Sequence, residues 1–321
     1  MAARIIGTGS YVPENTADNE YMSAIVDTSD EWIRTRTGIR ERRITAGETT
    51  SQMAILAARR AVEDAGILAD DIEIIIAATM TPDTCLPNVA CTIQEALGAK
   101  SAFCLDINAA CAGFVYGLNT IYAYIEAGLI KCALLVGAEA MSGILDWEDR
   151  STCVLFGDGA GAAVIKKSRK HGIIGTVMGS DGCKKDALVC KGRPLNNPFI
   201  KEPQKHEYLH MNGQEVFKFA VTKVPESICQ VLNRTHTRMG EVKYYILHQA
   251  NKKIIASVAR RLKENEDKFP VNLDRYGNTS AASIPILLDE LNQKGDLKSG
   301  DKIILSGFGG GLTWGAVLLE W

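Results

Sequence analysis

The chain has 321 residues, 46% of them hydrophobic, which is enough to build a large core of two domains or one duplicated domain. Its formal net charge of -2 gives no overall signature of a nucleic-acid-binding or membrane-surface protein. Nine cysteines, an odd number without short regular spacings, favour free thiols in a reducing compartment. Because the sequence has neither a signal-peptide pattern nor an apolar run of about 18 residues, we expect a cytoplasmic protein.

Strand and helix patterns alternate along the first half of the chain, which predicts an α/β fold. A helical pattern runs from Thr50 to Ala65 and stops at Gly66. The other elements expected here are an N-terminal strand, the strand 72–77, the helix 88–97, the strand 101–107, a long helix from residue 111, and the strands 132–137 and 162–166.

The second half repeats the order of strand, small-residue turn, helix and strand. Its expected elements are the helix 213–232, the strand 242–247, the helix 252–262, the helix 281–291 and the strands 302–306 and 316–319. One small-residue turn precedes the helix that starts at Cys111, and the other surrounds Asn278. We therefore divide the chain into the halves 1–170 and 171–321, and we expect the two turns to face each other.

Between the halves lies a segment, residues 182–211, that is rich in lysine, proline and asparagine and lacks apolar periodicity. A stretch of this length is typical either of a functional loop or of a solvated insertion. The sequence leaves both interpretations open.

Cys111 stands where a predicted strand turns sharply into a helical pattern, after the small residues Asn108, Ala109 and Ala110. A thiol at this place meets the positive end of a helix dipole and several free backbone N–H groups. Such a setting lowers the pKa of a cysteine from about 8.5 towards neutrality and makes it a nucleophile. The other cysteines lack this setting and are interpreted as core or loop residues.

Only one of the five histidines, His248, directly follows a predicted buried strand. Ligand sites collect at the carboxyl ends of such strands in α/β sheets. Asn278 occupies a small-residue turn in the same half, between Gly277 and Thr279. Taken singly, a histidine at a strand end and an asparagine in a turn also have ordinary structural explanations.

The glycine-rich turn 307–315 allows the backbone to approach a ligand closely and to aim N–H groups at it. Its pattern is not G-x-G-x-x-G and a strand is expected after it, so an oxyanion hole fits better than a dinucleotide loop. Cysteine, histidine, asparagine and an oxyanion loop suit acyl transfer through a thioester, but papain-like proteases use the same parts. The protease signature is absent around Cys111, which also lies far from the N-terminus.

A series of motifs in chain order resembles the β-ketoacyl-acyl-carrier-protein synthase III family of the thiolase superfamily, over essentially the whole chain. The motifs are DEWI and TRTGIRER (30–33 and 35–42), NAACAGF (108–114), FGDGAG (156–161), HQAN (248–251), YGNTSAAS (276–283) and GFGGG (307–311). The resemblance implies a thiolase-like fold, with two pseudo-duplicated α/β halves in a layered αβαβα arrangement.

By this resemblance, Cys111 takes an acyl group from acyl-CoA and passes it to malonyl-acyl-carrier protein, with loss of CO2, to form a β-ketoacyl product. His248 and Asn278 would stabilise the enolate that decarboxylation produces, and the N–H groups of Cys111 and Gly310 would hold the oxyanion. Elongating ketosynthases use two histidines, so Asn278 points to the initiating type. The CoA thioester is a substrate, and the resemblance implies neither a cofactor nor a metal.

The resemblance also places Trp32 and Arg150 on opposite faces of the CoA adenine, where an aromatic ring and a guanidinium can both stack. Thr28 and Arg36 match positions near the CoA nucleotide. An acidic acyl carrier protein is the expected second partner, attracted by cations on the helix 252–262. The predicted docking residues are Gln249, Ala250, Asn251, Lys252, Lys253, Arg260 and Arg261.

The relatives are homodimers, so we expect a homodimer, and no nucleic-acid or membrane partner. Leu86 lies at the family position that closes the acyl pocket across the dimer interface, where relatives also carry an aromatic residue. The primer therefore stays open between acetyl-CoA and a branched or longer acyl-CoA. The alternatives are a ketosynthase or acyltransferase of polyketide or secondary metabolism, a non-catalytic dimer partner, and a hydrolase.

Overall fold

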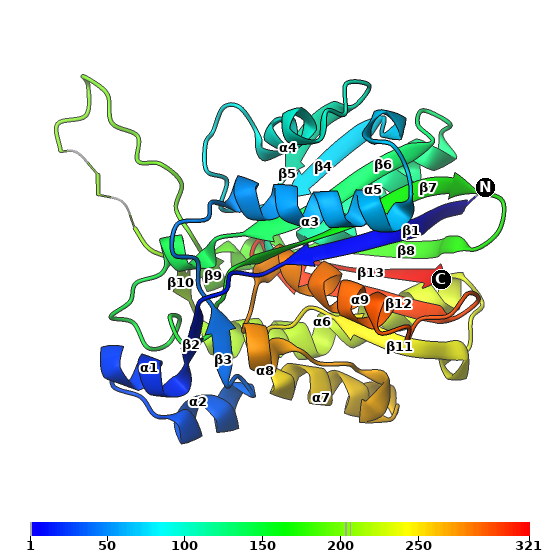
Figure 1. Ribbon diagram of the computed structural model, residues 1–321. Helices are drawn as coiled ribbons and strands as arrows, with labels where there is room; N and C mark the ends of the chain where they lie inside the picture. Colours follow the sequence, from blue (N-terminus) through cyan, green and yellow to red (C-terminus); the bar gives the residue numbers. More distant parts are fainter. Residues whose placement is uncertain (1, 203, 206) are drawn as a thin grey trace.

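Two β-sheets, each made by one half of the chain, form the framework of the protein (Figure 1). The structure is a computed structural model that describes residues 2–202, 204–205 and 207–321. The first sheet has the strand order β1-β7-β6-β4-β5 and the second has the order β11-β12-β13-β8. The strands are β1 (Ala2–Tyr11), β4 (Ile74–Ala78), β5 (Phe103–Ile107), β6 (Cys132–Glu139), β7 (Gly159–Ser168), β8 (Gly172–Ser180), β11 (Val242–Leu247), β12 (Lys302–Gly309) and β13 (Thr313–Glu320).

The strands β4-β6-β7-β1 of the first sheet share their topology with the second sheet. The first pair in each series is parallel, namely β4 with β6 and β11 with β12. The two following pairs are antiparallel in both series, β6–β7 and β7–β1 in one and β12–β13 and β13–β8 in the other. The repeat that the sequence suggests thus has a counterpart in strand order and direction.

Helices cover the outer faces of both sheets and fill the space between them (Figure 1). Helix α3 packs on the first sheet against β1 and β7, whereas α6 and α7 cover the second sheet. Helices α5 and α9 lie between the two sheets. The layers alternate helix, sheet, helix, sheet, helix, which confirms the expected thiolase-like α/β fold. The helices are α3 (Thr50–Ala65), α4 (Val89–Leu97), α5 (Gly113–Glu126), α6 (Gly213–Arg234), α7 (Lys252–Leu262) and α9 (Ser283–Gln293).

The central helix α9 is apolar around most of its circumference because it packs between two sheets. Its side chains Ile284, Ile286 and Leu288 are all buried. Glycine in the facing sheet allows the close approach, since a Cβ at Gly161 would lie 2.7 Å from the backbone nitrogen of Ile286. This packing fixes the position of the turn that precedes α9, which carries part of the candidate site.

A small unit between β1 and α3 is not predicted by the sequence patterns. It contains β2 (Thr16–Asp18), α1 (Asn19–Ile25), α2 (Asp30–Thr37) and β3 (Glu41–Arg43). Its centre is the fully buried guanidinium of Arg42, which donates to the carbonyls of Ala17 and Val154 and to the side chain of Asn19. Burial lowers the pKa of Arg42 to about 10. These hydrogen bonds tie the unit that carries α2 to the segment that precedes β7.

The segment 182–211 begins and ends with short ordered elements. These are the 3-10 helix η4 (Gly182–Ala187) and the two strands β9 (Leu188–Val189) and β10 (His210–Met211), which pair antiparallel. Between β9 and β10 most of the described residues are exposed, and the segment extends away from the body of the protein (Figure 1). Pro203 and His206 of this segment lie outside the described residues.

Candidate active site

Cys111, His248 and Asn278 line one pocket of about 210 Å³. They come from three separate places in the chain, namely the turn before α5, the residue after β11 and the turn before α9. The rest of the lining is mainly apolar, with Ser151, Leu155, Phe156, Leu188, Met211, Gly213, Val216, Phe217, Ala250, Asn251, Ile254, Phe308 and Gly309. The fold therefore brings together the three residues that the sequence singles out, and both ends of the segment 182–211 contribute to the same wall.

The two turns that precede the central helices have the same local structure. Each is a 3-10 turn, η2 (Ala110–Ala112) and η7 (Ser280–Ala282), and each leads directly into α5 or α9. Each also begins with a non-glycine residue at positive φ, Ala110 at 47° and Ser280 at 49°. The two turns are in contact, as the sequence repeat predicts. The helix expected from Cys111 begins as this 3-10 turn and becomes α-helical at Gly113.

The Cys111 thiol is buried, and burial raises its pKa to about 12. Ser280 acts in the opposite direction and lowers this pKa, whereas the Glu139 carboxylate raises it further. The expectation that the helix dipole lowers the pKa of Cys111 towards neutrality is therefore wrong for the unliganded pocket. Desolvation is the largest cause, and among the described residues no cation acts on this pKa to compensate a thiolate for the lost water.

The glycine-rich turn lies directly against the nucleophile. A Cβ at Gly309 would lie 2.6 Å from the backbone nitrogen of Cys111, so a side chain is excluded there. Gly310 is the next residue, and a Cβ there would lie 3.6 Å from the Cβ of Ala110. The two backbone N–H groups predicted to form an oxyanion hole, those of Cys111 and Gly310, thus belong to segments that contact each other.

His248 is buried and its ring is fixed from two sides. Its Nδ1 lies 2.7 Å from the hydroxyl oxygen of Ser283, and Phe308 packs against it edge-on with ring centroids 5.0 Å apart. The same Ser283 oxygen accepts a hydrogen bond from the backbone N–H of Gln249 at 3.3 Å, and its own proton is available to Nδ1. Burial lowers the pKa of His248 to about 3, so the ring is neutral at pH 7, and a hydrogen bond donated by Ser283 to Nδ1 would place the ring proton on Nε2.

Asn278 is held by its backbone and by its side-chain oxygen. Its N–H donates to the carbonyl of Leu155, and its carbonyl accepts from the N–H of Gly157. The side-chain Oδ1 accepts from the N–H of Ser280 at 2.9 Å. This bond orients the amide, so that Nδ2 is the group available to a molecule in the pocket.

Sequence patterns do not identify Glu139, a fully buried carboxylate close to Cys111. It is the last residue of β6, two positions beyond the predicted end of that strand. It accepts hydrogen bonds from the side chains of Thr79, Thr81 and Ser280, and burial raises its pKa to about 7. The signal that could have found it is the same one that marks His248, a titratable residue at the carboxyl end of a buried strand.

The residues predicted to bind CoA lie together at the surface. The guanidinium carbons of Arg36 and Arg150 lie 4.9 Å and 5.5 Å from the centroid of the Trp32 ring. Arg150 also donates to the backbone carbonyl of Asp27 at 2.6 Å. Thr28 follows directly, and its hydroxyl is buried without a hydrogen-bond partner among the described residues. An unsatisfied hydroxyl, four residues before an aromatic ring that two cations approach, suits a polar, anionic ligand.

The predicted docking residues divide into two groups. The side chains of Lys252, Lys253, Arg260 and Arg261 on α7 are exposed, and Ala250 and Asn251 line the pocket. Gln249 is buried instead, and its amide donates to the carbonyl of Leu247 and accepts from the N–H of Asn272. Gln249 is therefore a structural residue whose side chain cannot reach a protein docked at the surface, and the prediction for it is corrected.

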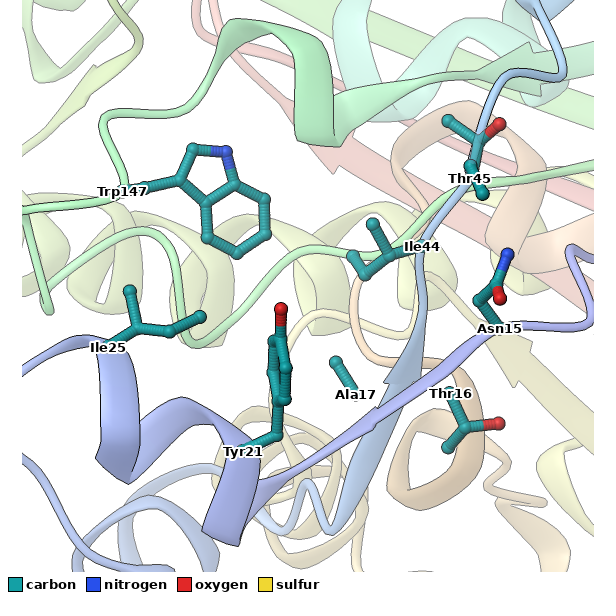
Figure 2. A pocket seen from close by; sticks show the side chains of 9 residues that line it. Asn15, Thr16, Ala17, Tyr21, Ile25, Ile44, Thr45 and Trp147 are labelled. Atoms are coloured by element: carbon teal, nitrogen blue, oxygen red, sulfur yellow. The ribbon is translucent and has the colours of Figure 1, made fainter.

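Leu86 is 87% exposed on the loop before α4, and it does not line the pocket of its own chain. A second, wider pocket of about 490 Å³ lies next to α1, where the side chains of Tyr21, Ile25, Ile44 and Trp147 surround it (Figure 2). The residues predicted from the sequence do not line that second pocket. Among the described residues we find no cluster of His, Cys, Asp or Glu side chains that could hold a metal ion, and no helix long and apolar enough to cross a membrane.

Comparison with known proteins decides the family. Residues 105–182 match the family model of 3-oxoacyl-[acyl-carrier-protein (ACP)] synthase III, and residues 232–321 match the model of its C-terminal part. The β-ketoacyl-[acyl-carrier-protein] synthase III of Clostridium botulinum strain Kyoto is 52% identical over 319 residues, 99% of this chain and 98% of that protein. The chain belongs to the 3-oxoacyl-[acyl-carrier-protein] synthase III family. The enzyme of the same name from Clostridium acetobutylicum is also 52% identical, over 100% of this chain and 99% of that protein.

Solved structures agree with this membership. The synthase III of Aquifex aeolicus superimposes with a TM-score of 0.93 at 45% identity, covering 99% of this chain and 100% of that one. The priming β-ketosynthase of the R1128 polyketide pathway also superimposes with a TM-score of 0.93, at 35% identity over 99% of this chain and 96% of that one. The fold is thus shared by an enzyme named synthase III and by one named for a polyketide pathway.

Proposed function

We propose that the protein is the initiating condensing enzyme of fatty-acid synthesis and that Cys111, His248 and Asn278 carry out its chemistry. It transfers an acyl group from acyl-CoA to Cys111 and condenses this group with malonyl-acyl-carrier protein, releasing CoA and CO2. The observation that carries the proposal is the convergence of these three residues in one pocket beside a glycine-rich turn. Membership of the synthase III family supplies the reaction class.

In the first half of the reaction, the Cys111 sulfur attacks the thioester carbonyl of acyl-CoA, and the CoA thiolate leaves. Negative charge develops on the carbonyl oxygen, where the backbone N–H groups of Cys111 and Gly310 can donate to it. Gly309 is needed for this geometry because a side chain would push the turn away from the nucleophile. The acyl chain then lies on the apolar wall that Leu155, Phe156 and Leu188 contribute to the pocket.

In the second half, the malonyl group loses CO2 and leaves an enolate whose carbon attacks the acyl-Cys111 thioester. The enolate oxygen needs neutral donors, because a protonated histidine would transfer its proton to the enolate carbon. The enolate could then no longer attack the thioester. His248 fits this role since burial keeps it neutral, and we assign its proton to Nε2 because Nδ1 faces the Ser283 hydroxyl. Asn278 supplies the second donor through Nδ2. We propose that the reaction uses no metal or organic cofactor, since each charge that develops is assigned a protein donor.

The CoA nucleotide is assigned to the surface around Trp32. Two guanidinium groups already lie over this ring, and Arg150 is held there by the carbonyl of Asp27. An adenine can enter between the ring and Arg150 once this exposed side chain shifts, so that both faces of the base are stacked. The phosphates would then lie near Arg36 and the unpartnered hydroxyl of Thr28.

We propose that the acyl carrier protein docks on α7 and that the enzyme is a homodimer. The exposed Lys252, Lys253, Arg260 and Arg261 offer positive charge to an acidic partner, and Ala250 and Asn251 connect α7 to the pocket. Such steering acts mainly on the association rate and weakens as salt is added. Leu86 and Phe103, the first residue of the edge strand β5, are exposed in the single chain, and the rest of β5 is partly exposed, as expected for surfaces that a second copy covers.

Leu86 is assigned to the acyl pocket of the partner subunit and is therefore proposed to help select the primer. A leucine fills less space than an aromatic side chain, so the pocket should accept short branched primers beside the acetyl group. We expect isobutyryl-CoA to compete with acetyl-CoA in the wild type, and Leu86→Phe to favour acetyl-CoA. A wild-type preference strongly in favour of acetyl-CoA, unchanged in Leu86→Phe, would contradict this assignment.

A role in polyketide priming is the second candidate. The R1128 priming β-ketosynthase supports it, because its structure is as similar to this fold as that of the Aquifex aeolicus synthase III. Sequence identity supports the first candidate, with 52% to the clostridial synthases and 35% to the polyketide enzyme. A non-catalytic partner subunit would not need to retain Cys111, His248 and Asn278 together, and a hydrolase would not decarboxylate a malonyl group.

The test is a coupled assay of acyl-CoA primers with malonyl-acyl-carrier protein, followed by mass spectrometry of the carrier-bound product. The wild type should form the β-ketoacyl product from acetyl-CoA or isobutyryl-CoA, and Cys111→Ser should form none. Hydrolysis of acyl-CoA without a β-ketoacyl product would overturn the proposed function. A product formed only with the carrier protein of a polyketide pathway would support the second candidate instead.

A further inference from the structure

An exposed arm, which we define as residues 191–207, projects from the segment between the two halves of the chain (Figure 1). Its apolar side chains are not covered by the rest of the protein, since Phe199 is 93% exposed and Leu195 is 67% exposed. A large apolar side chain in this position loses the free energy that burial would supply. Exposed apolar groups at the end of a projection are typical of a surface that a second molecule covers.

The arm is held in shape by its own hydrogen bonds. The side chain of Asn196 exchanges two hydrogen bonds with the backbone of Gln204, at 3.0 Å and 3.4 Å. Near the end of the arm, the N–H of Ile200 donates to the carbonyl of Asn197 at 3.0 Å, and the N–H of Phe199 donates to the Asn197 side chain at 2.9 Å. These bonds fold the arm back on itself and present Phe199 at its tip. Because the arm is already ordered, binding costs it little conformational entropy.

The pocket beside α1 has the shape and the lining that an aromatic side chain needs. Its volume is about 490 Å³, with Tyr21 and Ile25 of α1 on one side and Trp147 on the other (Figure 2). Tyr21 is 58% exposed and Ile25 is 41% exposed, so the apolar walls of this pocket also lack a cover. A phenyl group between Tyr21 and Trp147 would bury apolar area and would gain the contacts that aromatic rings make with each other.

The charge of the arm is opposite to the charge around this pocket. Arg193, Lys201 and Lys205 of the arm are exposed, and none of them pairs with a carboxylate in the part of the chain that the structure describes. Residues 12–33, which supply the α1 side of the pocket, contain six carboxylates and no lysine or arginine. Opposite charges on two surfaces favour their encounter and help to fix their orientation.

The arm of a chain is directed away from the pocket of the same chain. It rises from one side of β9 and β10, whereas α1 lies on the other side of these strands (Figure 1). The base of the arm is fixed, because β9 pairs with β10 and the N–H of Leu209 donates to the carbonyl of Ile144 at 2.9 Å. A second copy related by a twofold axis offers its own arm and its own pocket at once, so the same contact can form twice.

We propose that the arm of each copy places Phe199 in the pocket beside α1 of the other copy, with the cations of the arm next to the carboxylates around that pocket. This inference rests on the homodimer of the proposed function and names a contact that holds the two copies together. It also makes the arm a functional part of the segment 182–211 rather than a solvated insertion.

Photo-crosslinking tests this contact without any substrate. Phe199→p-benzoylphenylalanine keeps an aromatic group at the tip and forms a bond with the residue that lies beside it. Isotopically heavy and light chains are mixed, and native mass spectrometry confirms that their subunits have exchanged. Adducts should then join heavy to light chains and map to peptides that contain Tyr21, Ile25 or Trp147. Ile25→Glu, which adds a carboxylate to the pocket, should remove these adducts, and Leu68→p-benzoylphenylalanine, at a position 74% exposed between α3 and β4, should form none of them.

The stability of the dimer gives a second measurement. Phe199→Ala should raise the dissociation constant of the dimer about 10²-fold in sedimentation equilibrium, because each dimer buries two phenyl groups and each contributes a factor of about 10. Leu68→Ala, which shortens another exposed apolar side chain, should leave this constant unchanged.

Adducts within a single chain, or adducts on another surface of the second copy, would overturn the proposal. A dimer that forms no heavy–light adduct, or one that Phe199→Ala does not weaken, would overturn it as well. A monomeric protein would overturn both this contact and the proposed homodimer. Since crosslinking needs neither acyl-CoA nor carrier protein, failure of the proposed enzymatic reaction would leave these results unaffected.

Discussion

Asn278 offers the sharpest test of the second half-reaction, because its two side-chain groups have separate tasks. Oδ1 accepts the Ser280 N–H at 2.9 Å and so fixes the amide, which leaves Nδ2 as the donor to the enolate. In Asn278→Asp the first contact is kept, but the second position becomes an oxygen that repels the enolate. Loss of one such donor typically lowers a rate by about 10²–10³, which corresponds to about 2.7–4 kcal/mol.

The assay separates the two half-reactions. Acylation of Cys111 by acyl-CoA should change little in Asn278→Asp, whereas decarboxylation of malonyl-acyl-carrier protein should fall by about 10²–10³. Asn278→Ala should show the same split, with an added loss of stability of about 1–3 kcal/mol because the buried Ser280 N–H loses its acceptor. Equal losses in acylation and decarboxylation, or decarboxylation at the wild-type rate, would refute the role given to the amide.

Three further predictions concern the surface and the glycine-rich turn. Trp32→Ala should raise the KM for acyl-CoA about 5- to 150-fold with little effect on kcat, since one stacked base contributes about 1–3 kcal/mol. Gly309→Ala should lower the free energy of unfolding, measured in urea, by about 1–3 kcal/mol, because the new methyl would lie 2.6 Å from the backbone nitrogen of Cys111. Gly310→Ala should lower this free energy by less, since its new methyl would have its nearest neighbour at 3.4 Å. Arg261→Glu should raise the KM for malonyl-acyl-carrier protein at low salt but not the KM for acyl-CoA, and Lys298→Glu, an exposed control outside α7, should change neither.

Elements with strong local signals are predicted well by the sequence. The helix α3 has the predicted bounds because Thr49 and Gln52 form a capping box at its start and Gly66 ends it at a φ of 62°. The strand β11 and the helix α7 also have the predicted bounds. In contrast, β8 is not predicted, since its glycines and its partly exposed residues give neither an apolar run nor a regular alternation.

The candidate site is predicted in part for the same reason. Cys111, His248 and Asn278 each follow a local signal at a strand end or a turn, and the repeat indicates which turns meet. Burial is a property of the folded chain, so the sequence does not reveal that the pKa of Cys111 is raised. Glu139 is missed because its hydrogen bond with Ser280, a residue of the other half of the chain, forms only after folding.

The central claim is that one acyl group passes through the Cys111 sulfur. The most direct measurement is to mix the enzyme with acetyl-CoA or isobutyryl-CoA alone and to map the acylated peptide by mass spectrometry. We predict one acyl group per chain, on the peptide that contains Cys111, and its loss as β-ketoacyl product when malonyl-acyl-carrier protein is added. An acyl group on another residue, or condensation by Cys111→Ala at the wild-type rate, would contradict the account.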